Sequence, residues 1–346
     1  MNKIIVLLLT ACLFSANALA YGPRGHHLVG AIADKRLAKN KAVAAKVKKL
    51  LDGITLAEAA TLPDEIKSWD GCNPKKKPSK KAVTNKTRIN KELRAFWKAN
   101  PCDGKPSHHV FHYTDVPVFG DEKYADGEAG RSKFDVVQMI PFCLRVLRGD
   151  EPEKNDRAIT KAVAIILLTH YLGDIHQPLH VGAEFFNAAG KPFEPTDTNH
   201  GFEDQGGNKL VLFTFMDGKL KQAGRTFHGY WDGQTVEDAF GTVADWKVAQ
   251  QLAQKQPSNW KLNGAGETWA EQMANDILPM AQEAHERLDF EKIKTQPGKH
   301  EITSGEAREK KKIGGTFYAV WAASIVKKEI HKGGWRLAAL LEEVLE

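Results

Sequence analysis

The sequence predicts a mainly α-helical fold, a single helical-bundle-like domain with one short β-hairpin. Two observations support this. Apolar residues recur at helical spacing in most apolar segments, whereas only one segment alternates with the period of a strand. The 346-residue length allows one large domain or two small ones, and no internal repeat is visible. We expect one domain over residues 21–346, because the motifs along it are complementary. Nothing in the sequence requires more than a monomer.

The first twenty residues predict a secretory signal peptide. "MNK" supplies the positive start, "IIVLLLTACLF" the apolar stretch, and "ALA" at residues 18–20 the cleavage site. The mature chain would then begin at Tyr21. "LTAC", ending at Cys12, offers an alternative as a lipoprotein signal. Either signal places the protein outside the cytoplasm, secreted or periplasmic. No later stretch approaches the ~20 apolar residues of a membrane span.

Helical spacing of apolar residues marks the main elements. Val29, Ile32, Ala33 and Leu37 predict a helix that begins just after His26. Further helices are expected over residues 132–149 (kinked at Pro141), 156–176, 267–288, 314–330 and 333–345. The segment 156–176 is apolar on nearly every side and is therefore expected to be a central buried helix.

The one strand-like segment is "KLVLFTFMDGKLKQAG", residues 209–224. Its alternation is interrupted by the dipeptide Asp217–Gly218, which is typical of a tight hairpin turn. We therefore expect a β-hairpin here.

A basic segment over about residues 71–106 is expected to be a surface insertion. It contains the lysine-rich stretch 72–91, which carries much of the net charge of +6. Such a stretch is either a solvated loop or a phosphate-attracting rim around a site. Cys72 and Cys102 flank this polar loop and are expected to pair in an oxidising compartment. Cys143 lies in an apolar stretch and is expected to be a buried thiol.

The candidate chemistry begins on the expected buried helix. His170 and Asp174 are one turn apart, so their side chains leave the same face. A hydrogen-bonded pair would satisfy both groups, which could not be buried unpaired without a large cost. However, His180 lies just beyond Pro178, and three donors in so short a stretch make a metal site as favoured as a hydrogen-bonded pair.

Other histidine and carboxylate pairs repeat this pattern. His228 and Asp232 are again four residues apart, and His112 and Asp115 are three apart. Nitrogen and carboxylate donors without cysteine favour zinc in a catalytic role. More than four candidate donors indicate more than one metal ion.

The ordered series of motifs resembles the S1/P1 nuclease family of zinc-dependent single-strand nucleases. The series runs "YGPRGH", "DEIK", "HYTD", "THYLGDIHQPLH", "GGNK" and "FHGYWD", with "GGWRLAALLEEVL" closing the chain. The resemblance covers nearly the whole mature chain. It implies a phospholipase C/nuclease-like helical fold and three zinc ions.

The resemblance also implies the ligands of each ion. The first would be held by Asp64, His112, His170 and Asp174; the second by His180, His228 and Asp232; the third by the α-amine and carbonyl of Tyr21, by His26 and by the other oxygen of Asp174. Tyr21 replaces the family's usual tryptophan but would bind through backbone atoms. His27 and His176 have no role in this scheme.

The activity implied is hydrolysis of single-stranded DNA and RNA by a zinc-activated water, giving 5′-phosphate products; 3′-nucleotides are a possible further substrate. Asp115 would orient or deprotonate the water, and Lys67 would offset charge in the transition state. Tyr113 would stack a base and Asn208 would contact it. Without the resemblance, Lys67 would be interpreted as an exposed helix lysine, Tyr113 as a core aromatic and Asn208 as a turn residue. Asp115 would be a turn or cap residue.

Two alternatives remain open. Zinc-dependent phospholipase C resembles this family in fold and metal scheme, but its last motif has glutamate where Asp232 stands. A non-catalytic exported zinc-binding protein would explain the histidines but would leave Asp115 and Lys67 without a role. The lysine-rich insertion and residues 183–205 depart from the family pattern and leave substrate preference open. No protein partner is implied.

Overall fold

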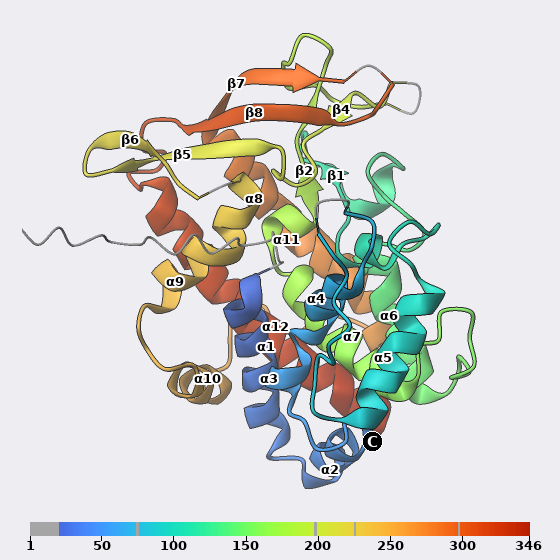
Figure 1. Ribbon diagram of the computed structural model, residues 1–346. Coiled ribbons are helices and arrows are strands. Elements are labelled where there is room, and N and C mark those ends of the chain that lie inside the picture. Colours follow the sequence, from blue (N-terminus) through green and yellow to red (C-terminus); the bar gives the residue numbers. More distant parts are fainter. Residues whose placement is uncertain (1–20, 74–75, 197–198, 225, 297) are drawn as a thin grey trace, which may run out of the picture.

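The computed structural model describes residues 21–73, 76–196, 199–224, 226–296 and 298–346, and the predicted signal peptide lies outside them. Helices predominate in these residues, which confirms the expected mainly α fold (Figure 1). The helices are α1 (Gly22–Leu37), α2 (Lys41–Leu50), α3 (Leu56–Ala59), α4 (Leu62–Glu65), α5 (Thr87–Ala99), α6 (Val136–Arg148), α7 (Lys161–Asp174), α8 (Phe227–Gly229), α9 (Thr235–Phe240), α10 (Asp245–Gln254), α11 (Trp269–Glu286) and α12 (Tyr318–Leu345).

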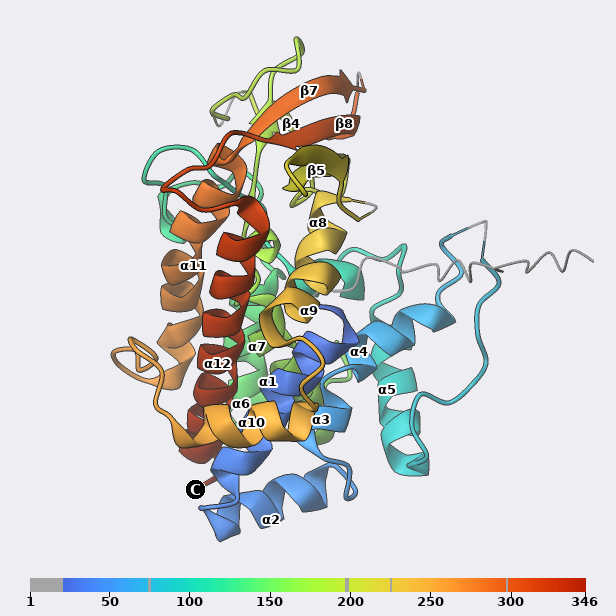
Figure 2. The same cartoon turned by 90° about the vertical axis from the view of Figure 1, so that its left-hand side faces the viewer.

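Helix α7 is the centre of the helical layer. Every residue from Ala162 to Asp174 is buried, as the apolar sequence predicts. Helices α1, α6 and α12 pack against it, and the two views show it enclosed among them (Figures 1 and 2). Thr160 caps its first turn by accepting a hydrogen bond from the backbone of Val163. The polar residues at its other end are therefore held on a rigid, dry support.

Helix α1 begins at Gly22, so the expected start just after His26 is wrong. Pro23 lies in the first turn, where its fixed φ favours a helix and its missing N–H costs nothing. The carbonyl of Tyr21 accepts the first helical hydrogen bond, from Gly25, at 3.0 Å. His26 consequently lies on the helix itself, and its side chain is buried against the rest of the protein.

Helix α12 is one helix where the sequence predicts two. Gly333 and Gly334 lie in its interior, although glycine weakens an isolated helix. A Cβ on Gly334 would meet Cβ of Ile32 on α1 at 2.5 Å, and one on Gly333 would meet the carbonyl of Leu172 on α7 at 3.0 Å. The glycines therefore allow α12 to pack closely on two neighbours, and this packing overrides their low helix propensity.

Helix α6 begins at Val136, four residues later than expected. The side chain of Asp135 caps it by accepting hydrogen bonds from the backbone of Val137 and Gln138. The helix continues through Pro141 to Arg148.

The strands form small sheets at one end of the helical layer (Figure 1). They are β1 (Val116–Pro117), β2 (Gly182–Ala183), β3 (Phe185–Phe186), β4 (Phe202–Glu203), β5 (Leu210–Met216), β6 (Lys219–Gln222), β7 (Leu288–Thr295) and β8 (Ile302–Glu309). Strands β5 and β6 form the expected hairpin, and both Asp217 and Gly218 have positive φ, as a type I′ turn requires. The sequence analysis missed β7 and β8, which extend this hairpin to a four-stranded sheet of order β6-β5-β8-β7.

The basic segment is partly helical. Helix α5 buries Ile89, Leu93 and Phe96, so this part of the segment belongs to the core. The loop before it is tied back by a disulfide between Cys72 and Cys102, which confirms the expected pairing. Cys143 is a buried thiol, also as expected. Among the described residues no helix has the length and apolarity needed to cross a membrane.

Candidate metal centre

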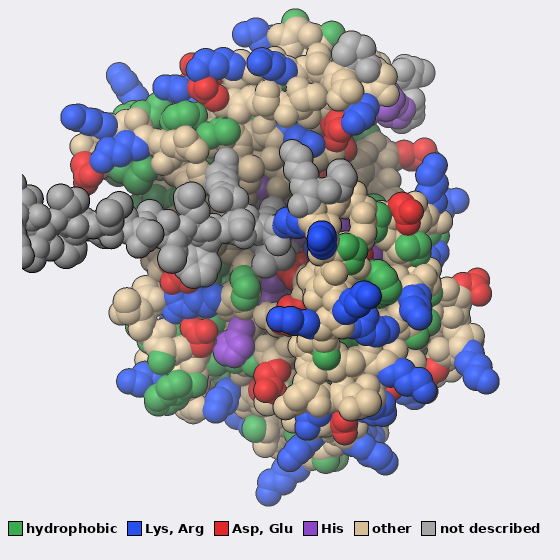
Figure 3. All heavy atoms as spheres, in the orientation of Figure 1, with side chains coloured by type: hydrophobic (Ala, Val, Ile, Leu, Met, Phe, Trp, Pro, Cys, Tyr) green, Lys and Arg blue, Asp and Glu red, His purple; other side chains and the backbone are tan. Residues whose placement is uncertain are grey.

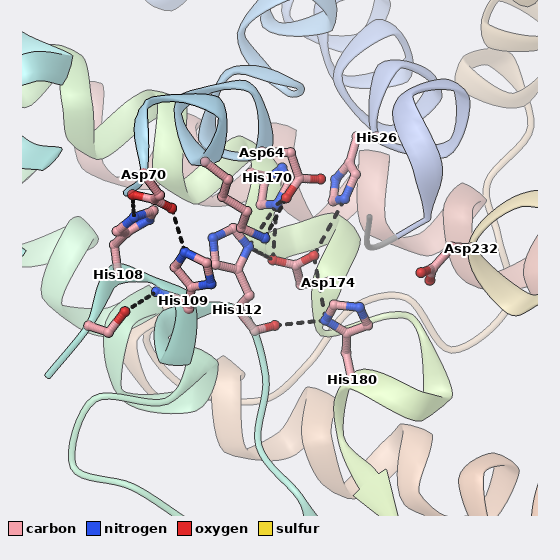
Figure 4. A network of polar contacts seen from close by, with 12 residues as sticks. His26, Asp64, Asp70, His108, His109, His112, His170, Asp174, His180 and Asp232 are labelled. Carbon is pink, nitrogen blue, oxygen red and sulfur yellow. Dashed lines mark hydrogen bonds and ion pairs between the residues drawn. The ribbon is translucent and has the colours of Figure 1, made fainter. Parts of the chain in front are cut away.

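The last turn of α7 places His170 and Asp174 at the middle of the candidate site. Both side chains are completely buried, and His170 Nε2 lies 3.3 Å from Asp174 Oδ2. Other segments bring donors to the same point. His112 Nδ1 lies 2.9 Å from His170 Nε2 and 3.1 Å from Asp174 Oδ2. Asp64 on α4 completes the group, with Oδ1 3.8 Å from His170 Nε2 (Figure 4).

A second group of donors lies beside the first. His180 follows α7 in a short helical turn, and its Nε2 lies 3.1 Å from Nε2 of His228. Asp232, one turn after His228, places Oδ2 3.4 Å from the same nitrogen. Gln177 donates a hydrogen bond to the other oxygen of Asp232 at 2.8 Å, which orients the carboxylate.

A third set of donors involves the other oxygen of Asp174. His26 Nε2 lies 3.4 Å from Asp174 Oδ1, and its ring stacks on His170 at 3.8 Å between centroids. Both ring nitrogens of His26 and Oδ1 of Asp174 are buried without a hydrogen-bond partner. Tyr21 is also fully buried. Burial raises the pKa of Asp232, and hydrogen bonds from Gln177 and from the Tyr21 backbone amide offset part of this rise.

The proton positions fixed by the backbone fit a bound cation. His170, His180 and His228 each donate Nδ1–H to a backbone carbonyl, of Ala60, His112 and Gly206 respectively, at 2.7, 2.9 and 2.7 Å. Their Nε2 atoms are then lone-pair donors.

The facing Nε2 atoms of His180 and His228 are the clearest indication of a bound cation. Burial lowers the pKa of both rings, so neither ring supplies a proton between them. Two lone pairs 3.1 Å apart would repel each other unless a cation lay between them. Carbonyl-oriented histidines of this kind are typical of metal sites, and histidine with carboxylate suits zinc.

A buried ion pair supports the loop that orients His228. Asp204, two residues before Gly206, accepts a hydrogen bond from Nε2 of His285 at 3.2 Å. The other ring nitrogen of His285 donates to the carbonyl of Ala281 at 2.8 Å. Since both nitrogens face acceptors, the ring is held as the cation. Burial alone would lower the pKa of His285, but the Asp204 carboxylate raises it above its ordinary value.

Replacing His285 by glutamine is expected to lower the free energy of unfolding by about 3 kcal/mol at pH 6, the range for breaking a buried pair. The folded-state pKa is raised, so this stabilisation is complete below the unfolded pKa of ~6.5 and is lost as pH rises through the folded-state value. The loss should therefore be smaller at pH 9. Urea denaturation of both proteins at the two pH values measures it, and equal losses would contradict a charged ring.

Lys67 and Asp115, the predicted catalytic residues, lie in different surroundings. Lys67 Nζ is 2.6 Å from Asp64 Oδ1. Burial would raise the pKa of Asp64, but Lys67 and His170 lower it below the usual range. Asp115 is buried, and its two neighbours in the chain hydrogen-bond to the carbonyls of residues 180 and 181. Asp115 is therefore held beside the segment that carries His180. Burial and the carboxylates of residues 203, 204 and 135 raise its pKa.

The two predicted base-contacting residues lie close in sequence to residues that form or orient the metal-ligand groups. Tyr113 directly follows His112 and is exposed over 36% of its surface. Asn208 closes a turn by donating from its side chain to the carbonyl of Gln205 at 3.0 Å. This turn contains Gly206, whose carbonyl orients His228. His176, expected to have no metal role, accepts a hydrogen bond from Arg336 instead.

Several polar residues around the site were not predicted from the sequence. Gln177, which orients Asp232, lies in the motif "QPLH" but was not singled out. A further cluster of Asp70, His108 and His109 lies next to the first group (Figure 4). Adjacent histidines at 108 and 109 were the available signal, but their common partner is almost forty residues away.

The chain is similar to known nucleases over nearly its whole length. The family model described as S1/P1 Nuclease matches residues 21–346. Endonuclease 3 of Arabidopsis thaliana is 22% identical over 346 residues, covering 98% of this chain and 94% of its own. Endonuclease 4 of the same plant is 23% identical, covering 94% and 90%. Endonuclease 1 is 27% identical over a shorter stretch of 193 residues, 55% of this chain and 52% of its own.

Proposed function

We propose, because this chain belongs to the S1/P1 nuclease family, that it is an exported zinc-dependent endonuclease acting on single-stranded nucleic acid. The main support for the proposal is that the Nε2 atoms of His180 and His228, each with a free lone pair, face each other at 3.1 Å. Next to them, the donor atoms of His112 and His170 lie equally close together beside Asp174. Such a set of donors is explained by bound cations and not by a protein-only hydrogen-bond network.

Three zinc ions would share this site. The proposed ligands are Asp64, His112, His170 and Asp174 for the first ion, His180, His228 and Asp232 for the second, and Tyr21, His26 and Asp174 for the third. The distances among the side chains of each group support the grouping. Asp174 would contribute to two ions, because its two oxygens face different histidines.

Zinc, when bound, supplies Lewis acidity and lowers the pKa of water, which makes a nucleophile available near neutral pH. The chain's own residues would do the rest. Asp115, held beside the His180 segment, would accept a proton from the attacking water or orient it. Lys67 would lie against the charge that develops on the phosphate oxygens, with its ammonium already fixed by Asp64. Products would carry a 5′ phosphate.

Export would complete the third site. Cleavage after Ala20 would make Tyr21 the chain terminus, and its α-amine would become available as a ligand once deprotonated. The disulfide between Cys72 and Cys102 supports an oxidising, secreted or periplasmic location.

Substrate contacts beyond the scissile phosphate are proposed for Tyr113 and Asn208. The exposed ring of Tyr113 could stack a base that is splayed out, which single strands offer more readily than duplexes. DNA, RNA and 3′-mononucleotides all remain candidate substrates. The Asn208 side chain would have to give up its bond to Gln205, or share it, to contact a base.

The direct test uses protein exported by its own host. Its native mass is expected to exceed the denatured mass by three zinc ions, on a chain that starts at Tyr21. The same protein should cleave single-stranded DNA and RNA and leave phosphatidylcholine intact. Hydrolysis of the lipid without cleavage of nucleic acid would favour a phospholipase C. Zinc binding without either activity would favour a non-catalytic zinc-binding protein.

A further inference from the structure

Two of the proposed metal ligands and part of the lysine-rich loop line one cleft. This cleft has a volume of about 870 Å³, and its walls include His26 and Asp64 at one part and Lys76 and Lys77 at another. Lys67 and His109 line it as well. Lys and Arg side chains stand out across the centre and right of the corresponding face (Figure 3). A strand with its scissile phosphate at the metal-ligand groups would therefore have further cationic groups within the same cavity.

Asp70 fixes the position of His109 on the cleft wall. Its Oδ2 lies 2.6 Å from Nε2 of His109, and its Oδ1 accepts hydrogen bonds from His108 at 3.1 Å and from Trp97 at 2.7 Å. His108 is buried and Asp70 is partly buried, whereas the side chain of His109 is 45% exposed. Figure 4 shows this group on the side of the ligand groups where His112 lies. The His109 ring is thus a half-exposed group with a rigid partner behind it.

This cluster differs from the metal-ligand groups in its hydrogen bonds. The Asp70 carboxylate has hydrogen-bond partners on both oxygens, Trp97 and His108 on Oδ1 and His109 on Oδ2. In the metal-ligand groups, by contrast, Oδ1 of Asp174 and Oδ2 of Asp232 are buried without a hydrogen-bond partner. The cluster is better explained by Nε2–H donors on the Asp70 carboxylate.

With Nε2 bonded to Asp70, the opposite edge of the His109 ring is left for a ligand in the cleft. Three lysines and three carboxylates line the cleft, but Asp64 is paired with Lys67 and Asp70 with the two histidines. The wall that carries Lys76 and Lys77 therefore favours an anion. A phosphate oxygen at Nδ1 would accept a hydrogen bond from the ring, while Asp70 would hold the ring in place through Nε2.

We propose that His109, positioned by Asp70 and assisted by Lys77, binds a phosphate of the substrate strand next to the scissile one. This inference rests on the proposed nuclease function and adds a residue that makes longer strands better substrates. Lys77 lies in the sequence between two tethered points, the disulfide of Cys72 with Cys102 and the backbone hydrogen bond from Ser79 to Ser68 at 2.7 Å.

The test compares two substrates of the zinc-loaded enzyme. Thymidylyl-thymidine has only the scissile phosphate, and an oligothymidylate of about ten nucleotides has neighbouring phosphates too. His109→Ala is expected to raise KM for the oligomer about 10-fold, the effect of one charge-assisted hydrogen bond. Its kcat, its zinc content and its KM for the dinucleotide should be unchanged. Asp70→Asn, which keeps an acceptor for the ring, should raise the oligomer KM less.

Two further variants test whether the change in KM comes from the cleft itself and not from a general effect of losing a surface side chain. Lys77→Ala, on an exposed loop, should also raise the oligomer KM and reduce the dependence of log KM on log salt by about 0.7, the value for one contact to a single strand. His200→Ala removes an exposed histidine outside the cleft lining and should change neither substrate. The inference would be overturned if His109→Ala had the wild-type KM for the oligomer. It would also be overturned if His109→Ala lost zinc and its KM rose equally for both substrates. If wild type cleaves neither substrate, the proposed function itself is wrong and this inference falls with it.

Discussion

Replacing Asp174 by asparagine is expected to remove at least two zinc ions and to lower kcat/KM by at least about 1,000-fold, more than the loss of a single charge-stabilising donor. The reason is the placement of its two oxygens. Oδ2 lies 3.1 Å from His112 and Oδ1 lies 3.4 Å from His26, so one carboxylate faces two ligand groups. Asparagine keeps the shape but has neither the charge nor a second oxygen. Burial raises the pKa of Asp174 to about 7, so this carboxylate depends on positive neighbours to stay ionised near neutral pH.

Zinc content from native mass and steady-state cleavage of single-stranded DNA measure the two effects together. Asp34→Asn is the control, because Asp34 is a partly buried carboxylate that accepts its hydrogen bonds from the backbone of Leu56 and Ala57. It should lose stability while keeping three zinc ions and full kcat. An Asp174→Asn protein that retains all three ions would contradict the shared-ligand scheme.

Replacing Asp115 by asparagine is expected to lower kcat by at least about 100-fold while leaving the zinc content unchanged, the scale of losing a general base. Asp115 is buried beside the segment of His180 but is not among the proposed ligands. Burial and neighbouring carboxylates raise its pKa, so its carboxylate accepts a proton more readily than an exposed one would. Asparagine has the same size and cannot accept that proton.

The two measurements separate three roles for Asp115. A large loss of kcat with three zinc ions bound supports the role as base or water-orienting group. Loss of zinc together with kcat would make Asp115 a support for the ligands instead. Unchanged activity would remove it from the mechanism. Asp34→Asn again controls for the general cost of losing a partly buried charge.

The sequence was sufficient for features that depend on local spacing. The buried helix α7 follows from its continuous apolar residues, and the hairpin of β5 and β6 follows from Asp217–Gly218. His170 and Asp174 could be placed on one face because the helical repeat requires it. The Cys72–Cys102 pairing was predictable because the remaining cysteine lies in an apolar segment.

Features that depend on long-range contacts were not predictable in this way. Half of the residues of strand β7 are exposed and charged, so its sequence carries a weak apolar signal, and the strand is held by its pairing with β8. The joining of α12 through Gly333 and Gly334 depends on close contact with other helices. The carbonyl partners of the ligand histidines come from distant backbone segments, which no local pattern encodes. The Asp70 cluster was missed for the same reason.

The close packing of α12 has a consequence for which sequence changes this protein can tolerate. Gly334 has no room for even a methyl group, because Ile32 on α1 occupies that space, and α1 is the helix that carries His26. A substitution at Gly334 would therefore push on the element that positions a candidate zinc ligand, although it lies near the end of the chain. Natural selection for catalytic activity should therefore also act on Gly334, although this residue would contact neither metal nor substrate. Substitutions there are expected to impair both the folding of the protein and the geometry of the site.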